Sequence, residues 1–240
     1  MKMKKLLKTG LVLVLALSML VPTLIIPSSA DTSGEVIYNA EIMTVKDGAN
    51  AIATMTFDDG VHASAEALKP LLEKYGLKAS LMVVPSRIQG IAPYTSGYST
   101  VAQLKELMEG GYIEPQSHSY SHLYIAEPGH ADYNAANNTD ENRYREIVGS
   151  YEFLTENFPE VDAISFAVPG GSYDSEIRDL LEKTFYAVRN GSIASGQVQT
   201  LDPADGRSAM SWHRLSSIWL NESNIEGIKT YLDTCVEDGG

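Results

Sequence analysis

Short apolar runs alternate with helical patterns along most of this chain, and this alternation constrains its fold more than any other feature. The runs that we predict to be strands span residues 51–57, 78–84, 112–116, 163–168, 186–188 and part of 210–219. Apolar residues recur every three or four positions between them, which predicts helices over 68–75, 101–108, 144–154, 177–185 and 225–232. Such alternation is typical of crossover units around a parallel sheet. It predicts an α/β fold and leaves open whether the sheet closes into a barrel.

Local signals place several ends of these elements. Thr100 and Gln103 form a capping box at the start of one helix, and Gly76 is placed to end the helix before it. Residues 85–99 contain glycine and proline without periodicity, so we expect irregular structure there. Residues 123–138 are small and polar, which predicts a loop over the mouth of the site.

The first thirty residues have the composition of an export signal. Four lysines precede an apolar centre at Leu11–Leu20, and the segment ends at residues 28–30 in Ser-Ser-Ala, which signal peptidases accept. Pro22 interrupts the apolar run, which is shorter than the ~20 residues of a spanning helix. We predict a signal peptide over 1–30, a secreted or cell-wall-associated protein without stable membrane insertion, and one domain over 31–240. An uncleaved anchor is the alternative.

The acidic balance of the chain limits its partners. Its formal charge is −13, and the predicted leader holds four lysines and no acidic residue, so cleavage makes the charge −17. Nucleic acid binds through cationic contacts to phosphate, so it is not an expected partner, and neither is anionic lipid. A neutral polysaccharide is compatible with this surface. Cys235 is the only cysteine, which excludes an intrachain disulfide and a multi-cysteine metal site. We expect a monomer.

Two adjacent carboxylates follow the first predicted strand. Asp58 and Asp59 come directly after the apolar run that ends at Phe57, and Gly60 closes the turn. In parallel α/β folds, the carboxyl ends of the strands are where ligands and chemistry are placed. Neighbouring residues of an extended backbone point to opposite sides, so we expect the two acids to do different jobs. One can bind a metal ion while the other acts as a base.

Two histidines follow another predicted strand. His118 and His122 are four residues apart, a spacing that lets both rings face one point on a helical turn or tight loop. With Asp59 they would make three protein ligands and leave a fourth position for water, as in catalytic zinc sites. Zinc fits this set best, and cobalt, nickel and manganese remain compatible. The alternative is that these are ordinary polar residues of a loop.

Taken together, these motifs resemble those of a known family, the polysaccharide deacetylases with a NodB homology domain, or carbohydrate esterase family 4. Its motif T-F-D-D-G stands at residues 56–60, and its motif H-[ST]-x-[ST]-H stands at residues 118–122. The resemblance implies a distorted (β/α) barrel with fewer than eight strands. It also implies Asp58 as general base and a divalent ion held by the motif residues Asp59, His118 and His122.

The third motif of the family departs from its usual form. It usually begins with an arginine that orients the catalytic aspartate, and Ala167 stands in that place. A subset of the family has F-A-x-P-x-G, which this chain matches at residues 166–171. The resemblance implies that the Gly170 backbone N–H holds the oxyanion. Arg214 is our candidate for the missing cation, with a surface ion pair as the alternative.

A second departure lies at the C-terminus. The family's Leu-x-His motif, which supplies the acid for the leaving group, has no match before the chain stops at Gly240, and His213 is the only late histidine. We therefore expect the last strand of the domain to be missing. An alkoxide leaves with less help than an amine, so O-acetyl cleavage would survive the loss of an acid better than N-acetyl cleavage. Tyr120, Tyr173 and Trp212 are candidates for stacking against sugar rings, and core packing is the alternative for Trp212.

These observations lead to one hypothesis and two alternatives. The hypothesis is a secreted, metal-dependent deacetylase acting on an acetylated polysaccharide such as peptidoglycan, a chitin-like glycan or xylan. One alternative is a metal-dependent hydrolase of small non-sugar amides. The other is a carbohydrate-binding protein that keeps the fold with little turnover, which Ala167 and the missing last strand both favour. The sequence does not distinguish N-acetyl from O-acetyl substrates.

Overall fold

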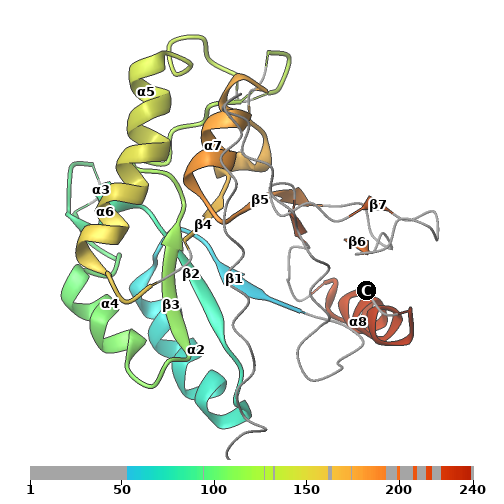
Figure 1. Cartoon of the computed structure of the whole chain (residues 1–240). Coiled ribbons are helices and arrows are strands. Elements are labelled where there is room, and N and C mark those ends of the chain that lie inside the picture. The colour runs from blue at the N-terminus through green and yellow to red at the C-terminus, as the bar shows by residue number, and fades with distance from the viewer. Residues whose placement is uncertain are drawn as a thin grey trace, which may run out of the picture. The chain divides into compact units, whose positions relative to one another are not determined.

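Six parallel strands form the main sheet, in the order β1–β2–β3–β4–β5–β8. They are β1 (Met55–Phe57), β2 (Ala79–Val83), β3 (Ile113–Ser117), β4 (Ser165–Ala167), β5 (Ala187–Ser192) and β8 (Leu215–Ser217). The strands β1 to β5 are labelled in Figure 1. The short strands β6 (Gln199–Thr200) and β7 (Ser208–Ala209) pair with each other. The predicted α/β alternation is confirmed, and the fold is a distorted (β/α) barrel whose main sheet has fewer than eight strands.

The computed structural model describes the greater part of the chain after residue 52. The described residues are 53–93, 95–126, 128–131, 133–161, 164–173, 175–192, 199–200, 208–209, 215–217 and 223–238. All of them belong to one unit, Met43–Gly240. The predicted leader and the predicted domain start at residue 31 lie outside these ranges. Within them, no helix has both the length and the apolar character needed to cross a bilayer.

Helices occupy the connections between most of the strands. The α-helices are α2 (His62–Tyr75), α3 (Pro85–Ile88), α4 (Val101–Met108), α5 (Asp140–Tyr144), α6 (Ser150–Asn157), α7 (Arg178–Thr184) and α8 (Ile225–Asp238). Shorter elements are the π-helix η2 (Arg145–Gly149) and the 3-10 turns η3 (Pro169–Gly171) and η4 (Ser175–Ile177). Both predicted helix ends are confirmed: Thr100 and Gln103 form the capping box of α4, and Gly76 ends α2 in the left-handed conformation.

The core lies where the helices meet the sheet. α4 and α6 both contact β3, and Figure 1 shows them on the same side of β1, β2 and β3. The largest side chains that are almost fully buried there include Leu72, Leu104, Ile147, Leu154, Phe158 and Leu181. Burying a side chain of this size contributes about 1.5–3 kcal/mol, so this packing fixes the strands whose ends carry the site.

Three predicted elements differ from the structure. The strand predicted over 51–57 begins at Met55 in the described residues and is only half-buried, because β1 pairs with β2 alone. The stretch predicted to be irregular after Pro85 contains α3, which starts with proline at its first turn, where proline is favoured. The strand predicted over 186–188 continues to Ser192 and so includes Arg189.

Candidate metal centre and active site

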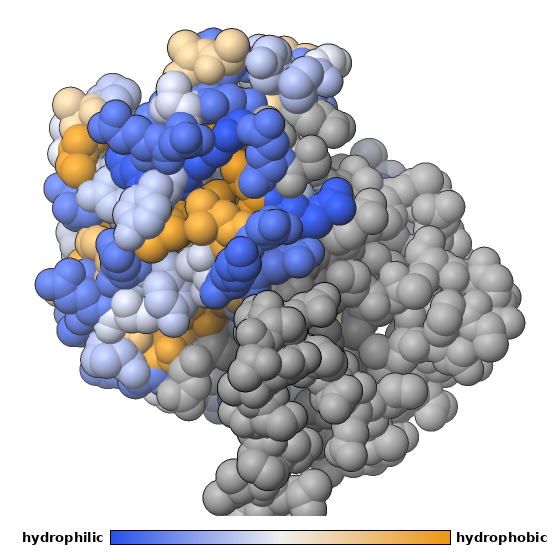
Figure 2. Space-filling model, turned by 45° about the horizontal axis from the view of Figure 1, so that its top comes forward, coloured by the Kyte–Doolittle hydropathy of each residue, from blue (hydrophilic) through white to orange (hydrophobic). Residues whose placement is uncertain are grey.

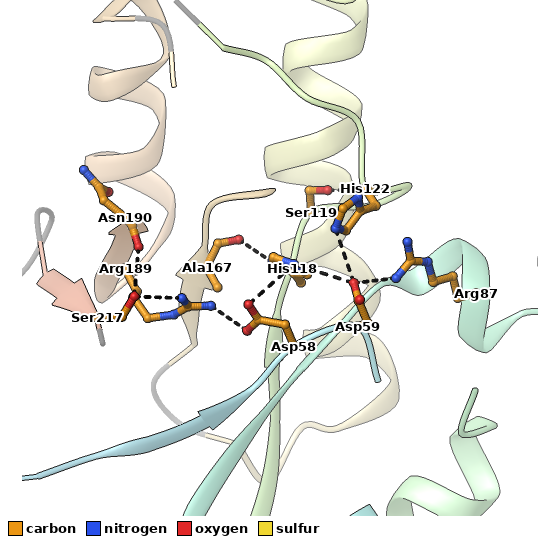
Figure 3. Close-up of polar contacts among 10 residues, drawn as sticks. All are labelled: Asp58, Asp59, Arg87, His118, Ser119, His122, Ala167, Arg189, Asn190 and Ser217. Atoms are coloured by element: carbon orange, nitrogen blue, oxygen red, sulfur yellow. Dashed lines mark hydrogen bonds and ion pairs between the residues drawn. The ribbon is translucent and has the colours of Figure 1, made fainter. Parts of the chain in front are cut away.

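The ends of β1, β2 and β3 bring the two acidic residues and the two histidines together. The His118 N–H donates to the Val83 carbonyl at 2.8 Å, which ties the end of β3 to the end of β2. β2 also pairs with β1 in parallel register, and Asp58 and Asp59 follow β1 directly. Parallel strands end on the same edge, so residues sixty positions apart in the chain become neighbours (Figure 3).

Three of these residues present ligand atoms to one point. The ligand atoms of Asp59, His118 and His122 all lie within 4.8 Å of one another. Asp59 Oδ1 is 3.3 Å from His122 Nε2 and 3.8 Å from His118 Nε2. Two ligand atoms bound about 2.05 Å from a tetrahedral ion lie roughly 3.3 Å apart. The donor set of one carboxylate and two imidazoles therefore fits a divalent ion with small adjustments.

The His118 ring is held in the form that a metal ligand needs. Its Nδ1 lies 2.8 Å from the Ala167 carbonyl oxygen, which can only accept, so Nδ1 carries the proton and Nε2 keeps its lone pair. The residue is 3 % exposed, and this burial lowers the pKa of His118 to about 4. The imidazole is therefore neutral near pH 7, with its free nitrogen directed at both aspartates (Figure 3).

Asp59 is held from two sides. Arg87 of α3 donates to Asp59 Oδ1 at 2.5 Å, and the Arg87 guanidinium also lies 5.0 Å from the centre of the Tyr98 ring. The hydrogen bond with His122 and then the charge of Arg87 hold the pKa of Asp59 well below its usual range. Asp59 is therefore ionised at neutral pH, the state required of a metal ligand.

Asp58 is turned the other way and has its own arginine. Arg189 of β5 donates from Nη2 to Asp58 Oδ1 at 2.5 Å and from Nη1 to the Ser217 hydroxyl at 3.2 Å. The other oxygen, Asp58 Oδ2, lies 3.9 Å from His118 Nε2. Oδ1 of Asp58 is thus bound to the Arg189 guanidinium, while Oδ2 faces His118 and is placed to accept a proton.

Arg189 lies beside Ala167, the position at which the family usually has an arginine. Ala167 and Arg189 are register partners on the neighbouring strands β4 and β5, and paired residues of parallel strands point to the same side of a sheet. The Val168 N–H also donates to the Arg189 carbonyl at 2.9 Å. An arginine one strand away therefore reaches Asp58. Arg214, our earlier candidate, lies outside the described residues.

Sequence reasoning missed both arginines. Arg87 follows the carboxyl end of β2 by four residues, and Arg189 lies within β5, level with Ala167, the last residue of β4. A cation at such a position, in a chain with two adjacent acids at the end of another strand, is the signal that could have found them.

The remaining predicted site residues lie as follows. Gly170 is in the turn after β4 with a φ of 70°, a conformation that glycine adopts easily. The Tyr120 hydroxyl accepts a hydrogen bond from Gln89 at 3.2 Å, and Tyr173 is partly buried against the core. Trp212 lies outside the described residues. The roles of Gly170, Tyr120 and Tyr173 in binding or catalysis stay predictions.

Comparisons with known proteins agree with this geometry. The chain is 28% identical over 132 residues to the Bacillus subtilis (strain 168) protein named "Putative polysaccharide deacetylase YxkH". This match covers 55% of the chain and 41% of that protein, so the chain spans about two fifths of its relative's length.

Solved structures share the fold. IcaB from Ammonifex degensii matches with a TM-score of 0.57 and 15% identity, over 74% of this chain and 71% of that one. The Streptococcus pyogenes deacetylase PplD, solved in complex with acetate, matches with a TM-score of 0.50 and 18% identity, over 68% of this chain and 64% of that one. The family model described as "Polysaccharide deacetylase" matches residues 46–188, more than half of the chain. This chain therefore belongs to the polysaccharide deacetylase family.

Proposed function

We propose that this chain is a secreted hydrolase that depends on a divalent metal ion, zinc in the first place, and removes N- or O-linked acetyl groups from a polysaccharide. The observation that carries the proposal is the convergence of Asp59, His118 and His122 beside a separately held Asp58. Cobalt, nickel or manganese would also suit one carboxylate and two imidazoles. The proposal of secretion is based on the composition of residues 1–30. If the exported protein is sequenced and its first residue is not near 31, the predicted cleavage is wrong.

In the proposed reaction, the metal ion and the protein's own groups have separate roles. A divalent ion, when bound, would polarise the acetyl carbonyl and make water a better nucleophile near pH 7. Asp58 accepts the proton of the attacking water through Oδ2, the oxygen that Arg189 leaves unengaged. His118 keeps its lone pair available because its other nitrogen donates to Ala167. The Gly170 N–H is the proposed donor to the oxyanion, a kind of contact whose loss costs about 3–4 kcal/mol.

Three observations support an acetylated polysaccharide as the substrate. PplD, which shares the fold, was solved with acetate, the product that deacetylation releases. The acidic chain disfavours polyanions, whereas a neutral glycan meets no such repulsion. The surface in Figure 2 carries an apolar area bordered by hydrophilic residues, an arrangement that suits the apolar faces and hydroxyl groups of sugars. Peptidoglycan, a chitin-like glycan and xylan are the candidates.

The ion pair between Arg189 and Asp58 bears on the binding-protein alternative. That alternative was motivated partly by the alanine at position 167, where the family usually has an arginine. Since Arg189 reaches the same aspartate, the substitution at 167 no longer argues for loss of turnover. The hydrolase of small non-sugar amides remains as the second candidate, because its site chemistry would be the same.

Release of acetate tests the proposal directly. The protein would be incubated with N-acetylated chitooligosaccharide, acetylated xylan and peptidoglycan, each with and without a chelator and with zinc added back. We expect release from at least one substrate, its loss in chelator and its return with zinc. Asp58→Asn should lower release by at least 10²-fold while zinc still binds, since general-base catalysis contributes about 10²–10⁴-fold. Tight glycan binding without release would instead identify a binding protein.

A further inference from the structure

Glu146 is a buried carboxylate that none of the proposed chemistry uses. It is 0 % exposed and lies on the π-helix η2, between α5 and α6. π-helical turns are rare, are costly, and occur often at functional sites. A carboxylate removed from water in this way must be compensated by hydrogen bonds or a cation. The partners of Glu146 therefore indicate what it does.

Those partners are in the loop that carries the two histidines. Ser121 donates to Glu146 twice, from its backbone N–H at 2.7 Å and from its hydroxyl at 2.6 Å. The Leu123 N–H makes a longer contact at 3.5 Å. The backbone carbonyl of Glu146 accepts from the Tyr120 N–H at 3.1 Å. The side chain thus holds the residues on both sides of His122, from a helix 23 to 25 residues away.

Arg145 supplies the cation for this buried carboxylate. Its Nε and Nη2 lie 3.1 and 3.0 Å from Glu146 Oε1, and its own side chain is half-exposed. The charge of Glu146 is therefore balanced from the solvent side, while Oε2 is directed at the loop backbone. Charge-assisted bonds of this kind are about twice as strong as neutral ones.

The loop needs such support because its backbone is unusual. Ser119 and His122 both have a φ of 62°, the left-handed region, which residues other than glycine occupy at a cost. The Ser119 hydroxyl accepts from the His122 N–H at 3.0 Å, which closes the turn from within. Glu146 fixes the intervening Ser121 from outside. Together these contacts aim the His122 ring at Asp59, whose oxygen is 3.3 Å from His122 Nε2.

We propose that Glu146 is the positioning residue of the metal centre: its carboxylate holds the loop from His118 to Leu123 in the strained form in which His122 can bind the ion. The proposal rests on the proposed function for the identity of the bound group. Glu146, which does not contact the ion, would thus affect the affinity of the protein for that ion. Without Glu146, the histidine loop would have to become ordered each time the ion binds. Replacing such partners of metal ligands typically costs 10–100-fold in affinity.

The test compares Glu146→Gln with Glu152→Gln, an exposed glutamate of the neighbouring helix α6. Glutamine has the same shape but presents an NH₂ group where one oxygen accepted an N–H or O–H. Three quantities are measured: the dissociation constant for Zn²⁺ by competition with a chelator, the midpoint of thermal unfolding without metal, and the hydrogen exchange of the Ser121 and Leu123 amides without metal. We expect Glu146→Gln to bind Zn²⁺ 10–100-fold more weakly and to exchange both amides faster. Glu152→Gln should match the wild type in all three.

Each result supports or overturns the proposal. A Zn²⁺ affinity unchanged in folded Glu146→Gln overturns it, and so does a lower unfolding midpoint with unchanged affinity, which would mean a purely structural role. If Glu146→Gln does not fold, Ser121→Ala removes one donor only; several-fold weaker Zn²⁺ binding then supports the proposal and equal binding overturns it. If the wild type binds no Zn²⁺, the proposed function fails, and the amide exchange of the metal-free proteins still shows whether Glu146 orders the loop.

Discussion

At the scale of single residues, two arginines divide the two adjacent aspartates between them. Arg87 binds Asp59 and Arg189 binds Asp58, each at 2.5 Å. The two aspartate side chains are chemically identical, but each therefore has a different environment. Asp59 faces His122 and His118 through the oxygen that Arg87 also contacts, whereas Asp58 keeps one oxygen apart from its arginine. This separation is the physical basis for giving one acid a ligand role and the other a base role.

Replacing Arg189 tests the role of its ion pair. We expect Arg189→Met to lower kcat about 10²-fold with little change in Zn²⁺ affinity, because Asp58 would lose its orientation while the three ligands stay in place. Arg189→Lys should lose less, since it keeps the charge but not the forked geometry that also reaches Ser217. The measurement is steady-state acetate release, with Arg178→Met of the exposed start of α7 as control. An unchanged kcat in Arg189→Met would show that Asp58 does not depend on this cation.

The buried His118 predicts how the metal-free protein responds to acid. Its pKa is lowered to about 4 in the folded state, against about 6.5 in the unfolded chain. Between these values the unfolded chain binds more protons, so the free energy of unfolding falls as the pH falls from 6.5 to 4. The loss is about 2–3 kcal/mol and is absent above pH 6.5. Urea unfolding at several pH values, with a chelator present, measures this loss. If the free energy of unfolding of His118→Gln depends on pH as strongly as that of the wild type, His118 is not its cause.

At the scale of elements, the helix after the histidine loop is docked to β3 by two buried hydroxyls. Ser117, at the end of β3, donates to the Ser150 hydroxyl at 2.9 Å, and Ser150 donates in turn to the Ile147 carbonyl at 2.8 Å. Both serines are fully buried. This chain of bonds joins the strand that leads into His118 to the π-helix that carries Glu146. The helix and the loop are thereby fixed relative to each other.

A double-mutant cycle measures this docking. Ser150→Ala leaves the Ser117 hydroxyl without an acceptor, so we expect a loss of about 1–3 kcal/mol in the free energy of unfolding. The double variant Ser117→Ala/Ser150→Ala removes both partners and should lose no more free energy of unfolding than Ser150→Ala alone. The coupling energy between the two hydroxyls is then about 1 kcal/mol. Urea denaturation of the four proteins gives the values. Strictly additive losses would mean that the two hydroxyls do not act together.

The element scale also explains which parts of the fold the sequence could predict. The capping box at Thr100 and the cap at Gly76 were predictable because each depends on residues a few positions apart. The π-helix was not, since a single wide turn adds one residue to a helix without changing its apolar pattern enough to be recognised. Arg189 was missed because its partner Asp58 is 131 residues away, and the sequence does not show which acid a cation on another strand will meet.

At the scale of the whole molecule, the grouping of Asp59, His118 and His122 was predictable for a topological reason. Parallel strands with helical crossovers all end on one edge, so residues that follow different strands are brought together whatever their distance in sequence. In the sheet order β1–β2–β3, only β2 separates the strand that precedes Asp59 from the strand that precedes the two histidines. The predicted leader and Trp212 lie outside the described residues and stay predictions.

The same topology would make binding of the proposed metal ion depend on the whole fold. The proposed ligands follow β1 and β3 in the chain, and unfolding separates them, so an ion that binds only the folded chain stabilises it. At a free Zn²⁺ concentration about 100 times the dissociation constant, the gain is about 2.7 kcal/mol, or roughly 5–10 °C in Tm for a domain of this size. His122→Ala should abolish this shift, whereas Asp58→Asn should keep it, because Asp58 is held by Arg189 as a base and not as a ligand. Thermal unfolding with and without Zn²⁺ decides the matter. An equal shift in His122→Ala would place the ion elsewhere, and loss of the shift in Asp58→Asn would make that residue a ligand.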